Sequence, residues 1–305
     1  MYTSHKQAGF SHYVAILSLV VLGVVGFTGW KVYSGQKKTD TQPSQTSTQS
    51  SDNSTTEVVA ETPKEPDSAS TLETPVKVAT SDSKQYFYYG APAGQNNAKV
   101  KRIIISLPGH GSTAEQDYAA WLPHIKTDSY ALASLNWWDG DGEKVDDYYS
   151  PADVNKLSRS FLNQQGYDNA DLIILEGFSR GSANSYSVIA EDRNAGSPVF
   201  DAAISASGKY QTDFPLSANI INGPKSATLY KNVYWVMACG DKDDNPDRDG
   251  CPGMQTAKTF VEAHGATVLG FLEDPDGGHG AFHAGNKGLP QQALKLIAQK
   301  ILGSN

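Results

Sequence analysis

The sequence predicts an α/β domain in which a mostly parallel sheet is covered by helices on both faces. Between residues 84 and 305, short apolar runs alternate with longer segments of helical character. Strands of a parallel sheet are buried on both faces and therefore form continuous apolar runs, and the crossovers between them are usually helical. These roughly 220 residues are enough to enclose one sizeable core.

The expected elements follow one another with short connections. The run 102–107 ends in a Pro-Gly-His-Gly turn, and the run 172–175 leads into a glycine-rich turn and then a helix. Ser150 and Pro151 suit the N-cap and N1 positions of a further helix. Expected strands cover 86–89, 102–107, 130–137, 172–175, 201–205, 233–238 and 267–272, and expected helices cover 114–124, 151–165, 182–190, 254–264 and 291–301.

The turn after the run 172–175 contains the candidate nucleophile, Ser179. This serine lies in the segment Gly177-Phe178-Ser179-Arg180-Gly181, between a buried strand and a helix. A sharp turn there lifts a serine hydroxyl clear of the sheet, and small flanking glycines relieve the crowding. The alternative is a glycine-rich connection with an exposed serine, but the strand–turn–helix context favours a nucleophile.

A serine hydroxyl needs an adjacent base, and His279 is the preferred candidate. It lies in the loop Asp276-Gly277-Gly278-His279-Gly280, shortly after the expected strand 267–272. Functional side chains of a parallel sheet gather at the carboxyl ends of its strands, which is also where Ser179 is expected. His283, four residues later, is the alternate base.

An acid that orients the base is expected after the strand 233–238. The loop that follows this strand is rich in aspartate. An acidic run is often only a solvated loop, and the spacing leaves Asp241, Asp243 and Asp244 open as the acid.

Backbone amides are needed to stabilise the negative charge that develops on the substrate oxygen. One amide is expected from Arg180, the residue after the nucleophile. The other is expected from Gly111 or Ser112, in the turn that follows the strand 102–107. A plain glycine turn is the alternative for this second segment.

Together these segments resemble the α/β-hydrolase superfamily over nearly all of residues 84–305. The Gly109-His110-Gly111 turn is similar to the His-Gly oxyanion loop of that superfamily, and the chain order of serine, aspartate and histidine is the same. In the superfamily the acid often lies three residues after a glycine that ends the strand, which implies Asp243 after Gly240.

The resemblance is to short serine esterases that have no large lid of the lipase kind. It implies hydrolysis of a small-molecule or polymer-borne carboxylic ester through an acyl-enzyme on a Ser179–His279–Asp243 triad, without a cofactor. A peptidase or amidase on the same fold is one alternative. A surface binding module that has lost the chemistry is another.

Two further features beside these loops each have two interpretations. Trp137 and Trp138 follow an expected strand and could line a substrate pocket or pack beneath the loop. Asn245, Asp247 and Asp249 resemble the start of a calcium loop, with oxygen ligands at positions 1, 3 and 5. Position 12 is a threonine rather than the usual glutamate, so no metal is expected there.

Cys239 and Cys251 are the only cysteines of the chain. An even number of cysteines outside the cytoplasm favours a disulfide. We therefore expect these two residues to be bonded, with a pair of free thiols as the alternative.

The N-terminal region is expected to anchor the protein in a membrane. Residues 14–30 carry no charge and would span roughly 26 Å as a helix. With flanking aromatic and lysine residues, the segment 13–33 reaches about the thickness of a hydrocarbon core. We expect an uncleaved, single-pass signal anchor after a short tail, 1–12; a cleaved signal peptide and a buried helix of the domain are the alternatives.

The segment 34–83 is expected to be a disordered linker between this anchor and an extracytoplasmic domain, 84–305. Residues 39–83 contain no aromatic side chain and are dominated by polar residues and proline. Such a composition buries too little apolar surface to offset the chain entropy of folding. The net charge of −8 and the absence of a long basic run make nucleic acid an unsuitable partner. The sequence indicates no oligomeric state.

Overall fold

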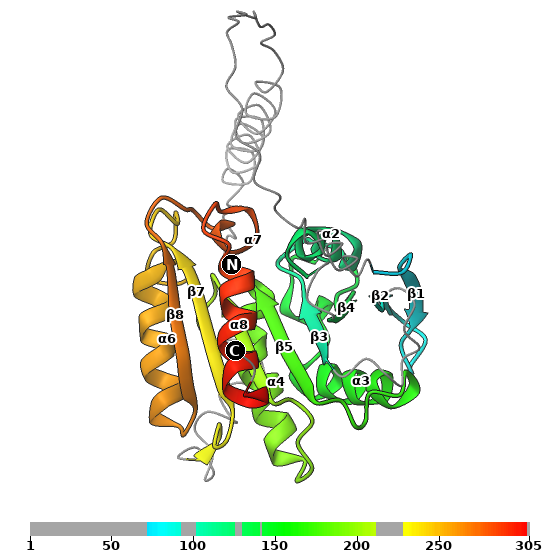
Figure 1. Cartoon of the computed structure of the whole chain (residues 1–305). Coiled ribbons are helices and arrows are strands. Elements are labelled where there is room, and N and C mark those ends of the chain that lie inside the picture. Colours follow the sequence, from blue (N-terminus) through cyan, green and yellow to red (C-terminus); the bar gives the residue numbers. More distant parts are fainter. Residues whose placement is uncertain (1–71, 93–101, 126–129, 141, 212–227, 304–305) are drawn as a thin grey trace, which may run out of the picture. The chain divides into compact units, whose positions relative to one another are not determined.

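The computed structural model describes residues 72–92, 102–125, 130–140, 142–211 and 228–303. All of them belong to the second of the two units into which the chain divides, Lys64–Asn305. Within these residues, eight strands form one sheet in the order β1-β2-β4-β3-β5-β6-β7-β8 (Figure 1). The strands are β1 (Val76–Ala79), β2 (Tyr86–Gly90), β3 (Arg102–Leu107), β4 (Ala131–Leu135), β5 (Leu172–Phe178), β6 (Ala202–Ala206), β7 (Tyr234–Gly240) and β8 (Thr267–Asp274).

The predicted mostly parallel sheet is confirmed. From β4 through β3, β5, β6 and β7 to β8, every neighbouring pair is parallel. Only the pairs β1–β2 and β2–β4 are antiparallel. The carboxyl ends of β3 and β5 to β8 therefore meet at one edge of the sheet, and the loops that leave this edge carry the candidate residues.

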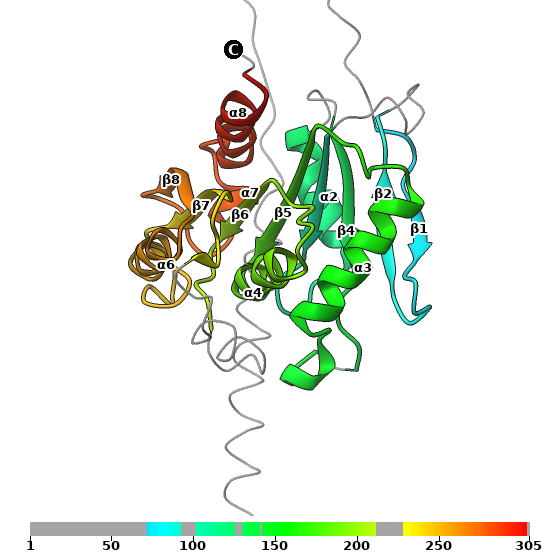
Figure 2. The ribbon, with the colours of Figure 1, turned by 90° about the horizontal axis from the view of Figure 1, so that it is seen from below.

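Helices cover both faces of this sheet, as Figure 2 shows. The helices are α2 (Ala114–Ile125), η2 (Val145–Asp147), α3 (Pro151–Gln164), α4 (Arg180–Asn194), α6 (Cys251–Ala263), α7 (Ala281–Ala284) and α8 (Leu289–Leu302). Alternate residues of β3 point to opposite faces, so Ile105 belongs to the core cluster that includes residues of α3, α4 and α6, whereas Ile104 belongs to the cluster that includes residues of α2 and α8. Ser150 caps α3 as predicted, because its hydroxyl accepts a hydrogen bond from the Asp153 amide at 3.1 Å.

The structure corrects the expected boundary between linker and domain. Strand β1, Val76–Ala79, falls inside the range 34–83 that the composition assigned to a disordered linker. This strand lies at the sheet edge and is mostly exposed, so it lacks the apolar run by which buried strands are predicted. The start of ordered structure was therefore placed about a dozen residues too late.

The helices α6 and α8 also begin earlier than predicted. Their first turns contain Pro252 and Pro290, which were treated as part of the preceding loops. Proline is compatible with the first turn of a helix, because the amides there have no intrahelical partner.

The predicted tail 1–12, the anchor 13–33 and most of the linker lie outside the described residues. Among the helices that are described, none combines the length and apolar character needed to cross a membrane.

Candidate active site

Ser179 occupies a strained turn between β5 and α4. Its backbone has φ 55° and ψ −114°, in a region that residues with a side chain rarely adopt. The Ser179 amide donates a hydrogen bond to the carbonyl of Ala206 at 2.8 Å, which ties the turn to the end of β6. This hydrogen bond helps to hold Ser179 in its strained conformation.

The two glycines that flank Ser179 are required by close backbone contacts. A Cβ atom on Gly177 would lie 2.4 Å from the carbonyl oxygen of Gly181, and one on Gly181 would lie 2.0 Å from that of Leu107. Larger side chains would thus separate α4 from β5 and β3. The expected glycine-rich elbow has this physical basis.

His279 lies between Ser179 and Asp243. Its Nε2 is 2.8 Å from Ser179 Oγ, and its Nδ1 is 2.7 Å from Asp243 Oδ2. An ionised carboxylate only accepts hydrogen bonds, so Nδ1 carries the proton and Nε2 is free to accept the proton of the serine hydroxyl. The structure thus brings together the three residues that the resemblance implied.

Asp243 is held rigidly in this arrangement. Its side chain is 1% exposed, and its second oxygen accepts a hydrogen bond from the Asn245 amide at 2.8 Å. The acid loop and the base loop are also joined directly, because the Lys242 amide donates to the Gly277 carbonyl at 2.9 Å. Gly240 allows this approach, since a Cβ there would lie 2.3 Å from the Gly277 oxygen.

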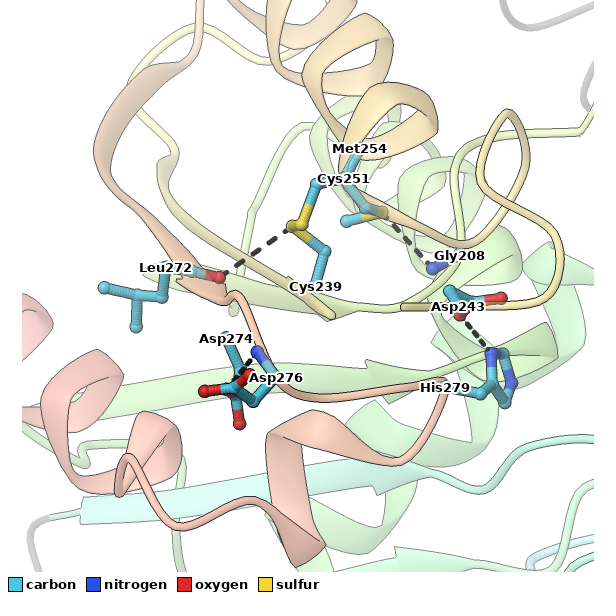
Figure 3. The surroundings of a disulfide bond; sticks show 9 residues. All are labelled: Gly208, Cys239, Asp243, Cys251, Met254, Leu272, Asp274, Asp276 and His279. Atoms are coloured by element: carbon cyan, nitrogen blue, oxygen red, sulfur yellow. Dashed lines mark hydrogen bonds and ion pairs between the residues drawn. A yellow bond between two sulfur atoms is a disulfide. The ribbon is translucent and has the colours of Figure 1, made fainter. Parts of the chain in front are cut away.

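The predicted disulfide between Cys239 and Cys251 is present, and it closes the acid loop. Cys239 lies in β7 and Cys251 is the first residue of α6, so the bond joins the two ends of the segment that carries Asp243. Figure 3 shows the bond close to the pair formed by Asp243 and His279.

The alternates from the sequence lie elsewhere. Asp241 and Asp244 are exposed, whereas Asp243 is buried against His279. His283 packs against Phe178 and Trp121, and its Nε2 has no hydrogen-bond partner among the described residues. Burial, together with neighbouring His124, lowers the pKa of His283 to about 3.

The loop after β3 lies against Ser179, as expected of an oxyanion loop. A Cβ on Gly109 would be 3.2 Å from Ser179 Cβ. The Ser112 amide, one of the two predicted donors, is already bonded to the Gly109 carbonyl at 3.1 Å. Gly111 has φ +68° and does not line the cavity over Ser179, whereas His110 does. Of the two predicted donors, the Ser112 amide is therefore already engaged within the loop.

Trp137 and Trp138 do not line the cavity over Ser179, but both border a separate hollow of about 230 Å³ beside Tyr148 and Tyr149. The indole N–H of Trp137 donates to the Pro108 carbonyl at 3.0 Å, and that of Trp138 donates to the Ser112 carbonyl at 2.9 Å. The two side chains hold both ends of the oxyanion loop, which fits the alternative interpretation of packing beneath a loop.

The three residues of the calcium-like segment have separate surroundings. Asn245 and Asp247 are exposed, while Asp249 is buried and its Oδ2 accepts two hydrogen bonds from Arg248. The carboxylate of Asp249 lies near the carboxylate of Asp243 and the ring of His279. Asp249 therefore belongs to the surroundings of the candidate triad.

A buried pair of acids beneath the elbow was not predicted from the sequence. Ser106 Oγ lies 2.5 Å from Asp117 Oδ2 and 2.6 Å from Glu176 Oε2, and both acidic residues are buried. A hydroxyl has one proton, so it donates a hydrogen bond to one carboxyl and accepts a hydrogen bond from the other, which must then be protonated. Burial raises the pKa of both groups, and for Glu176 the nearby Asp117 charge raises it further.

A cavity of about 400 Å³ opens over Ser179. The oxyanion loop borders it at Gly109, His110 and Ser112, and the base borders it at His279. This volume is within the range of pockets that bind small molecules. An ester or amide bond of a small substrate could therefore meet the serine hydroxyl here.

Comparisons with known proteins identify the fold. No family model matches the sequence, and no curated protein matches it. Solved structures do match. The esterase of Pyrobaculum calidifontis is 12% identical, with a TM-score of 0.53 over 75% of this chain and 85% of its own. A hormone-sensitive lipase from a metagenome library is 14% identical, with a TM-score of 0.53 over 76% and 86%.

The acylaminoacyl peptidase of Pyrococcus horikoshii is 14% identical, with a TM-score of 0.54 over 77% of this chain and 42% of its own. These structures share one architecture. The chain has the α/β-hydrolase fold. In this α/β-hydrolase fold, Ser179, Asp243 and His279 follow β5, β7 and β8 respectively, so the parallel sheet delivers all three to one edge.

Proposed function

We propose that this α/β-hydrolase-fold chain is a serine hydrolase that cleaves carboxylic esters. The observation that carries the proposal is the continuous line of hydrogen bonds from Asp243 through His279 to Ser179. Its support is geometric, because a nucleophile, a base and a group that orients the base are the three parts that acyl transfer requires.

In the proposed reaction, Ser179 Oγ attacks the ester carbonyl carbon while its proton passes to His279 Nε2. The amide of Arg180 and an amide of the loop after β3 donate hydrogen bonds to the oxyanion of the tetrahedral intermediate. His279 then gives the proton to the departing alcohol, which leaves an acyl-enzyme on Ser179. Water then attacks the acyl carbon while one of its protons passes to His279. Return of that proton to Ser179 Oγ releases the carboxylic acid and restores the free enzyme.

Ser179→Ala should abolish hydrolysis of short nitrophenyl esters and labelling by a fluorophosphonate, because no other group can form the acyl-enzyme. The melting temperature should change little, since alanine leaves the turn and its hydrogen bond to Ala206 intact. Labelling that persists in this variant would refute the assignment. Absence of labelling in the wild type would favour a binding module instead.

A peptidase or amidase is the second candidate, supported by the structural likeness to an acylaminoacyl peptidase. This chain matches only 42% of the length of that longer peptidase chain. Matched ester and amide substrates with the same acyl group decide between the two. We expect ester turnover to dominate, and faster cleavage of the amides would reverse the choice.

We also propose that residues 13–33 anchor the enzyme in the cell membrane with its catalytic domain outside the cytoplasm. The support is the uncharged run 14–30 and the polar stretch that follows it. The full chain should remain in the membrane fraction after carbonate washing, and a variant without residues 1–33 should not. Release of the full chain by carbonate would contradict the anchor.

A further inference from the structure

Two arginine residues border the cavity over Ser179. Arg180 and Arg248 both border it, together with the polar side chains of His110 and Gln211. Pockets for uncharged acyl groups are lined mainly by apolar and aromatic side chains. Two arginines beside the candidate nucleophile therefore require a different explanation, particularly in a chain whose net charge is −8.

Within the described part of the chain, no carboxylate balances the charge of Arg180. Its guanidinium carbon lies 4.7 Å above the ring of Tyr148, and its Nη1 donates to the Gly142 carbonyl at 3.3 Å. Both partners are uncharged, and no described residue forms an ion pair with Arg180. The contacts with Tyr148 and Gly142 fix the orientation of a cation that retains unused N–H donors.

The carboxylates near the cavity do not pair with Arg180. Asp249 accepts hydrogen bonds from Arg248 Nε and Nη2 at 2.8 and 2.6 Å, and Asp243 lies behind His279 and does not border the cavity. Glu143, at the rim beside His110, is 68% exposed and therefore strongly screened by water. Among the described residues that border the cavity, Arg180 is therefore the charged residue that no carboxylate pairs with.

We infer that the substrate is an ester that carries a carboxylate, which Arg180 binds while Ser179 attacks the ester carbonyl. This inference rests on the proposed serine hydrolase function and adds the chemical class of its substrate. A guanidinium presents donors whose geometry matches both oxygens of a carboxylate. Monoesters of short dicarboxylic acids, or acyl esters of hydroxy acids, fit a cavity of about 400 Å³.

The test compares charged esters with neutral partners of the same shape. The 4-nitrophenyl monoester of glutarate is compared with its methyl-capped diester, and 4-acetoxybenzoate with its methyl ester. These two pairs place the carboxylate on the acyl side and on the alcohol side. We expect kcat/KM in one pair to favour the charged ester by about ten- to hundred-fold, as for a charge-assisted hydrogen bond. The preference should shrink as salt is added.

Arg180→Gln should reduce this preference by at least about ten-fold. The ratio of the two substrates is the readout, so a general change in activity cancels. Lys156→Gln is the matched control, because it removes the same charge from an exposed position on α3 outside the cavity and should leave the ratio unchanged. An equal loss of preference in both variants would point to the overall charge and overturn the role of Arg180.

Binding measured by calorimetry with Ser179→Ala decides the inference without turnover. The charged ester of the preferred pair should bind about ten-fold more tightly than its neutral partner, and Arg180→Gln in the same background should remove the difference. Equal binding and equal hydrolysis of charged and neutral esters would overturn the carboxylate inference alone. Failure of the wild type to cleave any ester or to react with a fluorophosphonate would instead overturn the serine hydrolase proposal.

Discussion

At the scale of single residues, burial distinguishes the candidate acid from its neighbours in the same loop. Asp243 is the buried acid of a loop in which Asp241 and Asp244 face solvent. Its two oxygens accept from His279 and from the Asn245 amide, so the carboxylate cannot turn away from the ring. The orientation of His279 should therefore depend on this one carboxylate.

Asp243→Asn should lower kcat by about 10⁴-fold with little change in KM. The amide nitrogen of asparagine would donate toward Nδ1, which favours the tautomer that cannot accept the serine proton. Steady-state kinetics on a nitrophenyl ester measures the effect. Asp241→Asn and Asp244→Asn are the matched controls and should stay close to the wild-type rate. A comparable loss of rate in either control would contradict the assignment of Asp243 as the acid.

At the scale of elements, the active site depends on how loops are joined to each other. The loop between β7 and α6 is closed by the Cys239–Cys251 disulfide and bonded through Lys242 to the base loop at Gly277. Trp137 and Trp138 hold the oxyanion loop in a similar way. The candidate catalytic groups thus lie on loops that are joined to other parts of the domain.

Replacing both cysteines by alanine should lower the free energy of unfolding by about 3 kcal/mol, because the closed loop restricts the unfolded chain. Urea denaturation measures this loss. Since the same loop carries Asp243, activity of the variant should also be lost at a lower temperature than in the wild type. Dithiothreitol should leave the alanine variant unchanged, which controls for effects of the reductant. Unaltered unfolding would show that the bond does not constrain the loop.

At the scale of the whole molecule, the buried pair Asp117 and Glu176 links strands β3, β4 and β5 to helix α2. Ser106 bonds to both acids, Ser134 donates to Asp117 at 2.7 Å, and Trp121 donates to Glu176 at 3.1 Å. The folded state therefore holds a proton that the unfolded chain would release near the ordinary carboxyl pKa of about 4. The free energy of unfolding should consequently depend on pH through these two buried acids.

The sign of this link follows from the raised pKa of both acids. Below about pH 4 these two acids are protonated in both the folded and the unfolded chain, and their contribution to stability is fully present. As the pH rises above 4, they ionise first in the unfolded chain, so the free energy of unfolding falls. Glu176→Gln should make this fall in stability between pH 4 and 8 clearly shallower, because glutamine cannot ionise. Urea unfolding at several pH values tests it, with exposed Glu262→Gln as the control. An unchanged slope would contradict a shared proton.

The sequence alone determined the features that are encoded within a few consecutive residues. The elbow at Ser179, the loop of His279 and the cap at Ser150 are local patterns, because each depends on a turn or a helix start and its immediate neighbours. The alternation of apolar runs was also sufficient to predict the mostly parallel sheet. Strand β1 escaped prediction because an exposed edge strand needs no apolar run.

Only the tertiary structure decided which of several equivalent residues meet. It selected Asp243 over Asp241 and Asp244, turned Trp137 and Trp138 toward the oxyanion loop, and placed Glu176 beside Asp117 across 59 positions of sequence. Each of these outcomes depends on the order of strands in the sheet and on which side chains it buries. Local sequence does not specify that order, since it is fixed by packing between segments that are distant along the chain.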